Sequence, residues 1–331
     1  MTRDRSVSVI IPAHNAAQFI GTAMGSLVHQ FDDPTLLQVI VIDDGSTDGT
    51  ADIARTFEGR VGSIEVITHA SPEGVGTARV VGLEAADRAH VAFLDADDWW
   101  APGRLPSLVD RLHALDVDYV RTDHVRVFDD GSPREIHRAP DGRRERALRS
   151  RDTVLPVDAS SLVDYPFPWA GLFHRKLVED GSLAYDRGLH SFEDRVAIWR
   201  LALSDAAVAV VDAPWAMYRR SVATSLTQVY DSRQLDFIKG FATVRDLVIS
   251  DGNRDFEAKM VRQFLAISAH HVGRQRGMTR DVKGQLRTAI GDFARTLDPA
   301  MLRTQWEAAG SARRALLRSA IAPVLSQEAR A

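Results

Sequence analysis

Short apolar runs alternate with amphipathic segments along the chain as far as residue 128. The runs are rich in β-branched side chains, which is typical of buried strands, and they cover residues 7–11, 38–42, 64–67 and 91–94. Apolar residues at helical spacing fill the intervals and predict helices after Asn15, after Ser46 or Thr47, over about 76–86 and over 105–115. This alternation predicts an α/β fold with a mainly parallel central sheet and helices on both faces.

The pattern changes in the second part of the chain. A further strand, a helix and two short strands are predicted over residues 119–128, 193–203, 207–211 and 215–218. From about residue 232 the strand patterns vanish and apolar side chains keep helical spacing. We therefore predict an α/β domain over residues 1–230, with halves at about 1–128 and 129–230, and a C-terminal helical domain over 231–331.

Three unusual segments stand at the carboxyl ends of predicted strands, which is where open parallel sheets bind ligands. They are Pro12-Ala13-His14, Asp43-Asp44 and Asp95-Ala96-Asp97-Asp98. Carboxylates at the end of a buried strand are costly unless their charge is offset, and Mg²⁺ or Mn²⁺ is the usual offset. Because side chains alternate along an extended backbone, Asp95 and Asp97 can point into the same space. An acidic loop that merely caps a strand is the simpler interpretation of the last segment taken alone.

Composition and charge narrow the classes of protein. The chain has 331 residues and no cysteine, so disulfides, thiolate zinc sites and cysteine nucleophiles are excluded, and a reducing compartment is favoured. The net charge of −4 predicts no general attraction to nucleic acid. The start of the chain has no signal-peptide core, and no apolar stretch approaches the ~20 residues of a membrane span. We expect a cytoplasmic protein, either free or peripheral to the inner face of the membrane.

Familiar nucleotide-binding motifs are missing from the carboxyl ends of the predicted strands. Residues 12–17 read Pro-Ala-His-Asn-Ala-Ala, where a dinucleotide-binding fold would have Gly-x-Gly-x-x-Gly, and the chain has no P-loop. A sugar nucleotidyltransferase would need a glycine-rich turn with basic residues at the same place. Residues 44–49 superficially resemble a calcium loop, but the twelfth position is Arg55 instead of Glu. The remaining possibility is a nucleotide site that relies on a metal ion instead of a glycine-rich loop.

Four short segments occur in the order and at the spacing of one enzyme family. They are Val7-Ser8-Val9-Ile10-Ile11-Pro12-Ala13-His14-Asn15, Val41-Ile42-Asp43-Asp44-Gly45-Ser46-Thr47-Asp48-Gly49-Thr50, Gly74-Val75-Gly76-Thr77-Ala78-Arg79 and Phe93-Leu94-Asp95-Ala96-Asp97-Asp98. A fifth, Phe192-Glu193-Asp194, leads into a helix that carries a tryptophan. Over roughly its first two-thirds the chain resembles a family-2 glycosyltransferase of the inverting type with the GT-A fold.

The resemblance implies a role for each matching position. Pro12 and His14 border the base pocket, Asp43 contacts the base, Arg79 belongs to the donor site, Asp95 faces the donor ribose or sugar, Asp97 with Asp95 holds Mn²⁺ or Mg²⁺, and Asp194 is the general base. Three positions depart from the family pattern, and they bear on the base and sugar contacts. Pro72 and Val80 stand where many members have asparagine, and His14 stands where tyrosine or phenylalanine is common.

The implied reaction moves a sugar from a nucleotide-diphosphate donor, UDP-sugar being the expected type, to a hydroxyl acceptor. Asp194 takes the hydroxyl proton during one displacement, and the metal stabilises the departing diphosphate. Glu193 beside it raises the pKa of Asp194. In the alternative interpretation, both are ordinary carboxylates in the first turn of a helix. The competing functions are a sugar-phosphate nucleotidyltransferase and a degenerate, non-catalytic scaffold.

Other residues are predicted to meet the two substrates. Trp169, Phe173, His174 and Glu193 are expected at an acceptor site, with a place in the core as the alternative for Trp169. Arg219 and Arg220, followed by Ser225-Leu226-Thr227, resemble a segment that closes over the diphosphate, with a structural salt bridge as the alternative.

Two regions have no assigned role. The arginine-rich segment 134–151 is either a solvated loop or a flap for an anionic acceptor or an acidic membrane surface. The helical tail packs on the first domain, forms a homo-oligomer or rests on a membrane. The expected acceptors are a glycan, a cell-wall polymer or a natural product.

Overall fold

The computed structural model describes residues 4–220, 231 and 235–328, and these form two compact units. The first unit contains residues 4–153 and 165–220, and the second contains 154–164 together with the C-terminal helices. The second unit therefore includes a segment from the middle of the chain, which the predicted division at residues 230 and 231 did not include. The residues directly before that division, 221–230, lie outside the described part.

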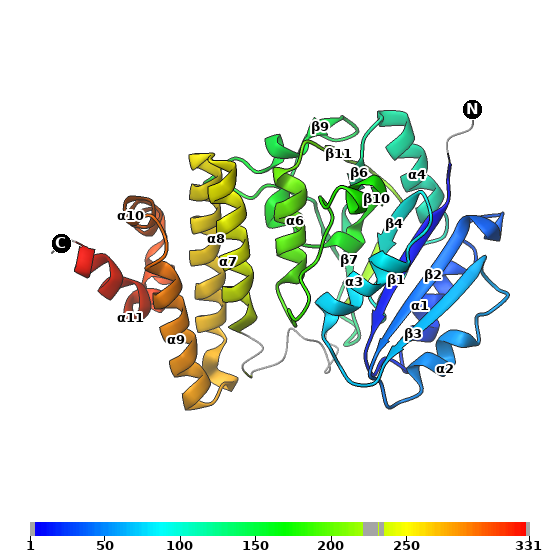
Figure 1. The fold of residues 1–331 in the computed structure, drawn as a ribbon, viewed down its shortest axis with the longest axis horizontal. Helices are drawn as coiled ribbons and strands as arrows, with labels where there is room; N and C mark the ends of the chain where they lie inside the picture. The colour runs from blue at the N-terminus through cyan, green and yellow to red at the C-terminus, as the bar shows by residue number, and fades with distance from the viewer. Residues whose placement is uncertain (1–3, 221–230, 232–234, 329–331) are drawn as a thin grey trace. The chain divides into compact units, whose positions relative to one another are not determined.

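An eight-stranded sheet in the order β3-β2-β1-β4-β10-β6-β11-β9 forms the centre of the first unit (Figure 1). Its strands are β1 Val7–Ala13, β2 Leu37–Asp44, β3 Ser63–His69, β4 His90–Phe93, β6 Tyr119–Arg121, β9 Leu148–Arg149, β10 Gly171–His174 and β11 Ala207–Val210. The pairs among β3, β2, β1 and β4 are parallel, as the alternating pattern predicted. Strand β10 is antiparallel to both of its neighbours, so the sheet is mixed beyond β4.

Helices connect the parallel strands. They are α1 Ile20–Leu27, α2 Thr50–Arg55, α3 Val75–Ala85, α4 Arg104–Leu115, α5 Lys176–Glu179 and α6 Glu193–Leu203. The two predicted caps were wrong, since α1 begins after Phe19 and α2 begins after Gly49, whose φ is 83°. The Asn15 side chain instead accepts a hydrogen bond from the backbone N–H of Thr47. Asn15 thus ties the two loops at the sheet edge together.

The single strand predicted over residues 119–128 is two strands in two sheets. β6 stays in the large sheet, whereas β7 His124–Phe128 joins a second sheet in the order β5-β12-β7-β8. The other strands of this small sheet are β5 Trp99–Trp100, β12 Ala216–Arg220 and β8 Glu135–His137. Because β5 follows the Asp95–Asp98 segment directly and pairs with β12, the small sheet adjoins that segment.

The second unit is helical, as the spacing of apolar residues predicted. Its helices are α7 Asp236–Asp251, α8 Arg254–Gly273, α9 Arg280–Ala294, α10 Pro299–Ala308 and α11 Ser311–Glu328. Phe241, Phe264 and Phe293 pack against one another in its core. Asn253, Thr279 and Asp298 cap α8, α9 and α10 with side-chain hydrogen bonds. None of the helices in the described ranges combines the length and apolar character needed to cross a bilayer.

Short 3₁₀ helices complete the chain. They cover Pro34–Leu36, Ser150–Thr153, Leu162–Asp164, Pro168–Ala170 and Gln275–Gly277.

Candidate active site

The acidic segment after β4 forms a tight turn that the neighbouring strands hold in place. The backbone N–H of Leu94 donates to Ile10 in β1 at 3.0 Å, and that of Asp98 donates to the Asp95 carbonyl at 3.0 Å. Asp98 is buried, and its Oδ1 accepts the backbone N–H of Arg219 at 2.8 Å. Burial raises the pKa of Asp98 well above its ordinary value, and the charges of Asp97 and Asp95 add to the effect. Asp98 therefore fixes the turn.

Arg219 holds the same turn from the other side. Its Nε donates to the Asp97 carbonyl at 3.0 Å, and its Nη1 donates to Asp129 at 2.8 Å. The guanidinium lies 4.9 Å from the centre of the Trp99 ring and 5.2 Å from that of Phe19. With Nε and Nη1 engaged at the turn, Arg219 fits the structural role that was the alternative, whereas its contact with the diphosphate stays a prediction.

Within the described ranges, the Asp97 carboxylate has no ion-pair partner and no hydrogen-bond partner outside its own backbone. Burial raises its pKa to about 6, and the charge of Asp95 acts in the same direction. A largely desolvated carboxylate that faces another carboxylate favours a bound cation.

Arg79 on α3 is the centre of a buried ionic cluster. Only 2% of it is exposed, and it pairs with three carboxylates. Its Nη1 donates to Glu193 Oε1 at 2.6 Å and to Asp194, while its Nη2 donates to Asp95 Oδ1 at 3.1 Å. Three of the segments singled out in the sequence thus meet at one guanidinium.

Close backbone packing between α3 and the loop before α6 brings Arg79 together with Glu193 and Asp194. A Cβ atom at Gly76, in the first turn of α3, would lie 2.7 Å from the Asp186 carbonyl and 2.9 Å from the Leu189 carbonyl. Only glycine lets the start of α3 approach the loop before α6 this closely. Glu193 and Asp194 form the first turn of α6.

The cluster has more negative than positive charge. Burial raises the pKa of Asp194 well above its ordinary value, and the charge of Arg79 offsets part of the shift. Burial likewise raises the pKa of Glu193, against the same opposing charge. Since one cation serves Asp95, Glu193 and Asp194, at least one carboxyl group is favoured to hold a proton or to gain another cationic partner.

Tyr185 also belongs to this cluster, although no sequence pattern predicted it. Its ring lies 5.4 Å from the Arg79 guanidinium and 5.5 Å from the Phe93 ring. Its buried hydroxyl acts on Asp194 as a hydrogen-bond donor, which lowers the pKa of that carboxyl against the larger effect of burial. No motif includes Tyr185, because it comes from the irregular loop before α6.

The ends of β1 and β2 form the predicted base pocket. Asp43 is 3% exposed, and its Oδ1 has no hydrogen-bond partner in the described part of the chain. The neighbouring Asp44 is fully engaged, because it accepts from His69 and from the backbone N–H groups of residues 73 and 74. His14 is fixed through a contact of 2.7 Å between its Nδ1 and the Asp44 carbonyl, and Pro12 pairs with Ile42. Asp44 therefore shapes the loop, and Asp43 keeps an oxygen available.

The structure does not bring all the predicted acceptor residues to this edge. Phe173 is fully buried and stacks on Tyr119, and His174 pairs with His90 at the start of β4, whereas the acidic turn follows the end of β4. The prediction for these two residues is corrected for that reason. Trp169 is 4% exposed and packs against His124 and Tyr218, which fits its alternative place in the core.

The carboxylates at the acidic turn can supply part of the ligand set of a divalent cation. Within the described ranges no three His, Cys, Asp or Glu side chains are grouped as a complete metal site. Mg²⁺ sites of nucleotide enzymes commonly use one or two carboxylates together with substrate phosphates. Asp97, with Asp95 beside it, matches this incomplete donor set. A bound nucleotide diphosphate would have to supply the remaining oxygen ligands.

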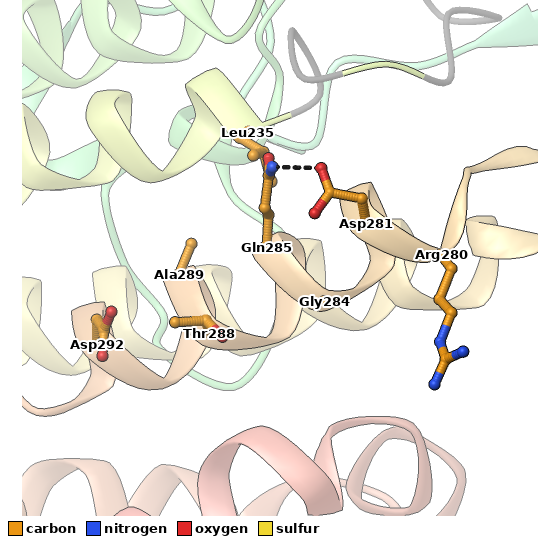
Figure 2. A pocket seen from close by; sticks show the side chains of 8 residues that line it. All are labelled: Leu235, Arg280, Asp281, Gly284, Gln285, Thr288, Ala289 and Asp292. Carbon is orange, nitrogen blue, oxygen red and sulfur yellow. Dashed lines mark hydrogen bonds between the residues drawn. The ribbon is translucent and has the colours of Figure 1, made fainter.

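The hollow drawn in Figure 2 lies in the second unit and includes none of these residues. It has a volume of about 770 Å³ and is lined mainly by one face of α9, with Leu235 at its rim. The Gln285 side chain donates to Asp281, one turn earlier on α9, at 2.7 Å. Nothing in this lining gives it a catalytic group.

Comparison with known protein families agrees with the geometry. The model of the family described as "Glycosyl transferase family 2" matches residues 8–179. The uncharacterized glycosyltransferase YibD of Escherichia coli (strain K12) is 28% identical over 190 residues, which are 57% of this chain and 54% of YibD. The chain spans about half the length of several relatives that it matches.

Solved structures show the same fold. Residues 1–349 of S. aureus TarS, in complex with UDP-GlcNAc, superpose with a TM-score of 0.73 at 19% identity, over 98% of this chain and 92% of that one. The mannosyltransferase PcManGT from Pyrobaculum calidifontis, in complex with GDP-Man and Mn²⁺, superposes with a TM-score of 0.52 at 17% identity, over 98% and 86%. The TarS match extends over both units, so the helical region is part of the shared architecture.

Proposed function

Because the chain belongs to glycosyl transferase family 2, we propose that it transfers a sugar from a nucleoside-diphosphate sugar to a hydroxyl group in one displacement that inverts the anomeric carbon. The Arg79 cluster is the observation that carries this proposal. Asp194 and Asp95 both pair with this guanidinium, which supports a site shared by a base and a donor-binding carboxylate. Membership of the family removes the reasons for favouring a nucleotidyltransferase or an inactive scaffold.

Asp194 acts as the general base in this proposal. Burial and its acidic neighbours raise its pKa, which makes an ionised Asp194 a stronger base than a free aspartate. In the free protein its carboxylate is held by Arg79. The guanidinium orients Asp194 and stabilises its charged form until the acceptor hydroxyl arrives.

The donor would lie along the edge from Asp43 to Asp97. Asp43 offers an unpaired oxygen to a base N–H, and His14 and Pro12 border the pocket. Asp97 and Asp95 would hold Mn²⁺ or Mg²⁺. The ion would neutralise the diphosphate as it departs. UDP-GlcNAc is the first donor to test, because a structural relative is solved with it.

The experiment is a binding titration of UDP with Mn²⁺ or with EDTA, together with hydrolysis of UDP-GlcNAc, UDP-glucose and GDP-mannose. We expect Asp97→Ala to abolish the difference between Mn²⁺ and EDTA, because Asp97 is the desolvated carboxylate without a fixed partner. Asp212→Ala is the matched control, since that carboxylate is 80% exposed. If UDP binds the parent protein equally well with EDTA, the metal assignment is wrong. If none of the three sugars is hydrolysed, the donor class is wrong.

A further inference from the structure

One face of the small sheet gathers arginine and aromatic side chains. Strands β7 and β12 are parallel, with Tyr218 opposite Arg126 and Arg220 opposite Phe128. Paired residues point to the same side of a sheet, and so do residues two apart along a strand. Tyr218, Arg220, Arg126 and Phe128 therefore share one face.

Further rings extend this face at its β8 end. His137 on β8 lies opposite His124, and the Phe167 ring is 5.5 Å from His137 and 6.3 Å from Tyr218. Phe167, His137 and Tyr218 are each partly exposed, whereas Trp169 and His124 are buried behind them. The partly exposed rings can contact a ligand, and the buried rings support them.

The two arginines on this face have donors to spare. Arg126 has a buried Nε with no hydrogen-bond partner among the described residues. It contacts His137 at 3.0 Å, and its ion pair with Glu135 is long, at 3.9 Å, to a carboxylate that is 60% exposed. Arg220 donates to the Tyr218 hydroxyl at 3.0 Å, with its guanidinium 5.3 Å from the centre of that ring.

Arginines of the nearby basic segment differ from these two. Arg138 and Arg144 both pair with Asp123, at 3.4 Å and 2.5 Å. Their charge is thus matched within the protein. The cationic character of the Arg126–Arg220 face is matched more weakly, by the long pair between Arg126 and the exposed Glu135.

This face adjoins the acidic turn. The residue next to Tyr218, Arg219, donates its backbone N–H to Asp98. The charges of Asp98 and Asp95 contribute to the raised pKa of the Tyr218 hydroxyl, although burial is the main cause. A molecule on the face is therefore close to the place proposed for the donor.

We infer that this face binds the acceptor, and that the acceptor is a saccharide or polyol chain carrying phosphate or carboxylate groups. The apolar side of the chain packs on Tyr218 and Phe167, and an oxyanion lies between Arg126 and Arg220. Guanidinium groups suit both anions, because their planar donors match two oxygens at once. The inference rests on the proposed function and places Arg220 on the acceptor side instead of at the donor diphosphate.

The test measures binding by calorimetry at 0.15 M salt, with UDP and Mn²⁺ present. The probes are a hyaluronan tetrasaccharide, a glycerol-phosphate oligomer and neutral cellotetraose. We expect the parent protein to bind at least one anionic probe tenfold or more tightly than cellotetraose. Arg126→Gln should weaken that binding about ten- to a hundredfold, as expected for one lost charge-assisted contact. The anionic probe that binds more tightly tells phosphate from carboxylate.

Arg138→Gln is the matched control, because it removes the same charge from an exposed arginine that already has a partner. It should change the affinity by less than about twofold. Equal loss in Arg126→Gln and Arg138→Gln, or no preference for an anionic probe, overturns the inference. Hydrolysis of UDP-GlcNAc is measured on the same samples. Intact hydrolysis without anion preference refutes the acceptor assignment alone, whereas absent hydrolysis in the parent protein counts against the proposed function.

Discussion

Two buried cations, Arg79 in the first unit and Lys259 in the second, show how differently the units use charge. Lys259 is fully buried. Its ammonium group donates to the Pro156 carbonyl at 2.9 Å and the Ala159 carbonyl at 2.6 Å, and it pairs with the Asp164 carboxylate at 2.7 Å. Arg79 is almost as buried, but it faces three carboxylates and leaves its Nε without a partner among the described residues. All the donors of Lys259 therefore have partners, whereas Arg79 keeps one donor without a partner in the described part of the chain.

The difference separates a structural role from a functional one. A buried ion pair whose hydrogen bonds are all made holds two segments together, and here it holds 154–164 on α8. The carboxylate edge also contains unpaired oxygens on Asp43 and Asp98 within the described chain. Buried polar groups without partners are costly, so their accumulation at one edge indicates a site that a ligand completes.

The largest effect that would test this comparison comes from Asp194→Asn. We expect kcat to fall by roughly 10²–10⁴-fold with the KM for the donor nearly unchanged, because the base is lost while the donor contacts stay. The midpoint of thermal unfolding should not fall, because the substitution removes one negative charge from a cluster that has too many. Steady-state kinetics and calorimetry provide both readouts.

Asp212→Asn is the control for Asp194→Asn, since it makes the same change at an exposed carboxylate. Unchanged turnover of Asp194→Asn would remove this residue from the mechanism. A large loss of stability without loss of turnover would make the Arg79 cluster structural, like that of Lys259.

The next largest effect is expected from Lys259→Met. It leaves Asp164 and two carbonyl groups without their cation, and breaking a buried pair in this way costs about 3–5 kcal/mol of unfolding free energy. Asp164 still accepts from Gln263 and Ser161, so we expect the lower end of that range. Chemical unfolding measures the effect, and donor hydrolysis by the folded variant should stay near that of the parent.

Lys239→Met is the matched control for this variant, because Lys239 also pairs with an aspartate but is 70% exposed. It should change the unfolding free energy by no more than about 1 kcal/mol. If Lys259→Met and Lys239→Met behave alike, Lys259 does not stabilise the second unit and the contrast with Arg79 fails.

The sequence predicted most of the parallel half of the fold, and the reasons are local. Residues 7–11 and 38–42 are mostly apolar and rich in β-branched side chains, and each became the buried centre of a strand. The division of residues 119–128 between two sheets could not be predicted, because both halves have the same pattern and only long-range pairing separates them. The caps failed for a similar reason, since Asn15 bonds to a distant loop instead of its own helix.

Motifs located the acidic turn and Arg79, but they could not describe the partners of each residue. Arg219 and Arg220 are adjacent in sequence, yet alternation along β12 sends them to opposite faces, one into the acidic turn and one toward Arg126. Phe173 was predicted at the acceptor site because it lies between the basic segment and Asp194 in the sequence and sugars pack on aromatic faces. Its burial follows from the antiparallel insertion of β10 into the middle of the large sheet, which no local pattern reveals.

The smallest effect concerns His124, a buried polar group in the first unit whose Nε2, like the Nε of Arg79, has no hydrogen-bond partner among the described residues. Burial lowers its pKa to about 2, and the charge of His137 adds to the shift. An unfolded histidine takes up a proton below its ordinary pKa of ~6.5, whereas folded His124 stays neutral, so folding loses about 1.4 kcal/mol per pH unit as the pH falls from 6.5. Between pH 6.5 and 4.5 the loss amounts to about 2.3 kcal/mol, because half of the unfolded histidine is already protonated at pH 6.5.

His124→Phe should remove this contribution. The ring keeps its place among Trp169, Phe167 and Tyr165, and the Tyr165 hydroxyl can still donate to the Thr122 carbonyl. Denaturant unfolding of the parent and the variant at several pH values, followed by a probe of the first unit, gives the difference directly. The other titrating groups contribute equally to both proteins and cancel in the comparison. Between pH 6.5 and 4.5 the unfolding free energy of the variant should therefore fall by about 2–3 kcal/mol less than that of the parent. Parallel stability curves would mean that His124 gains a proton in the folded protein and is therefore accessible to solvent, which would make it part of the ligand-binding face instead of its support.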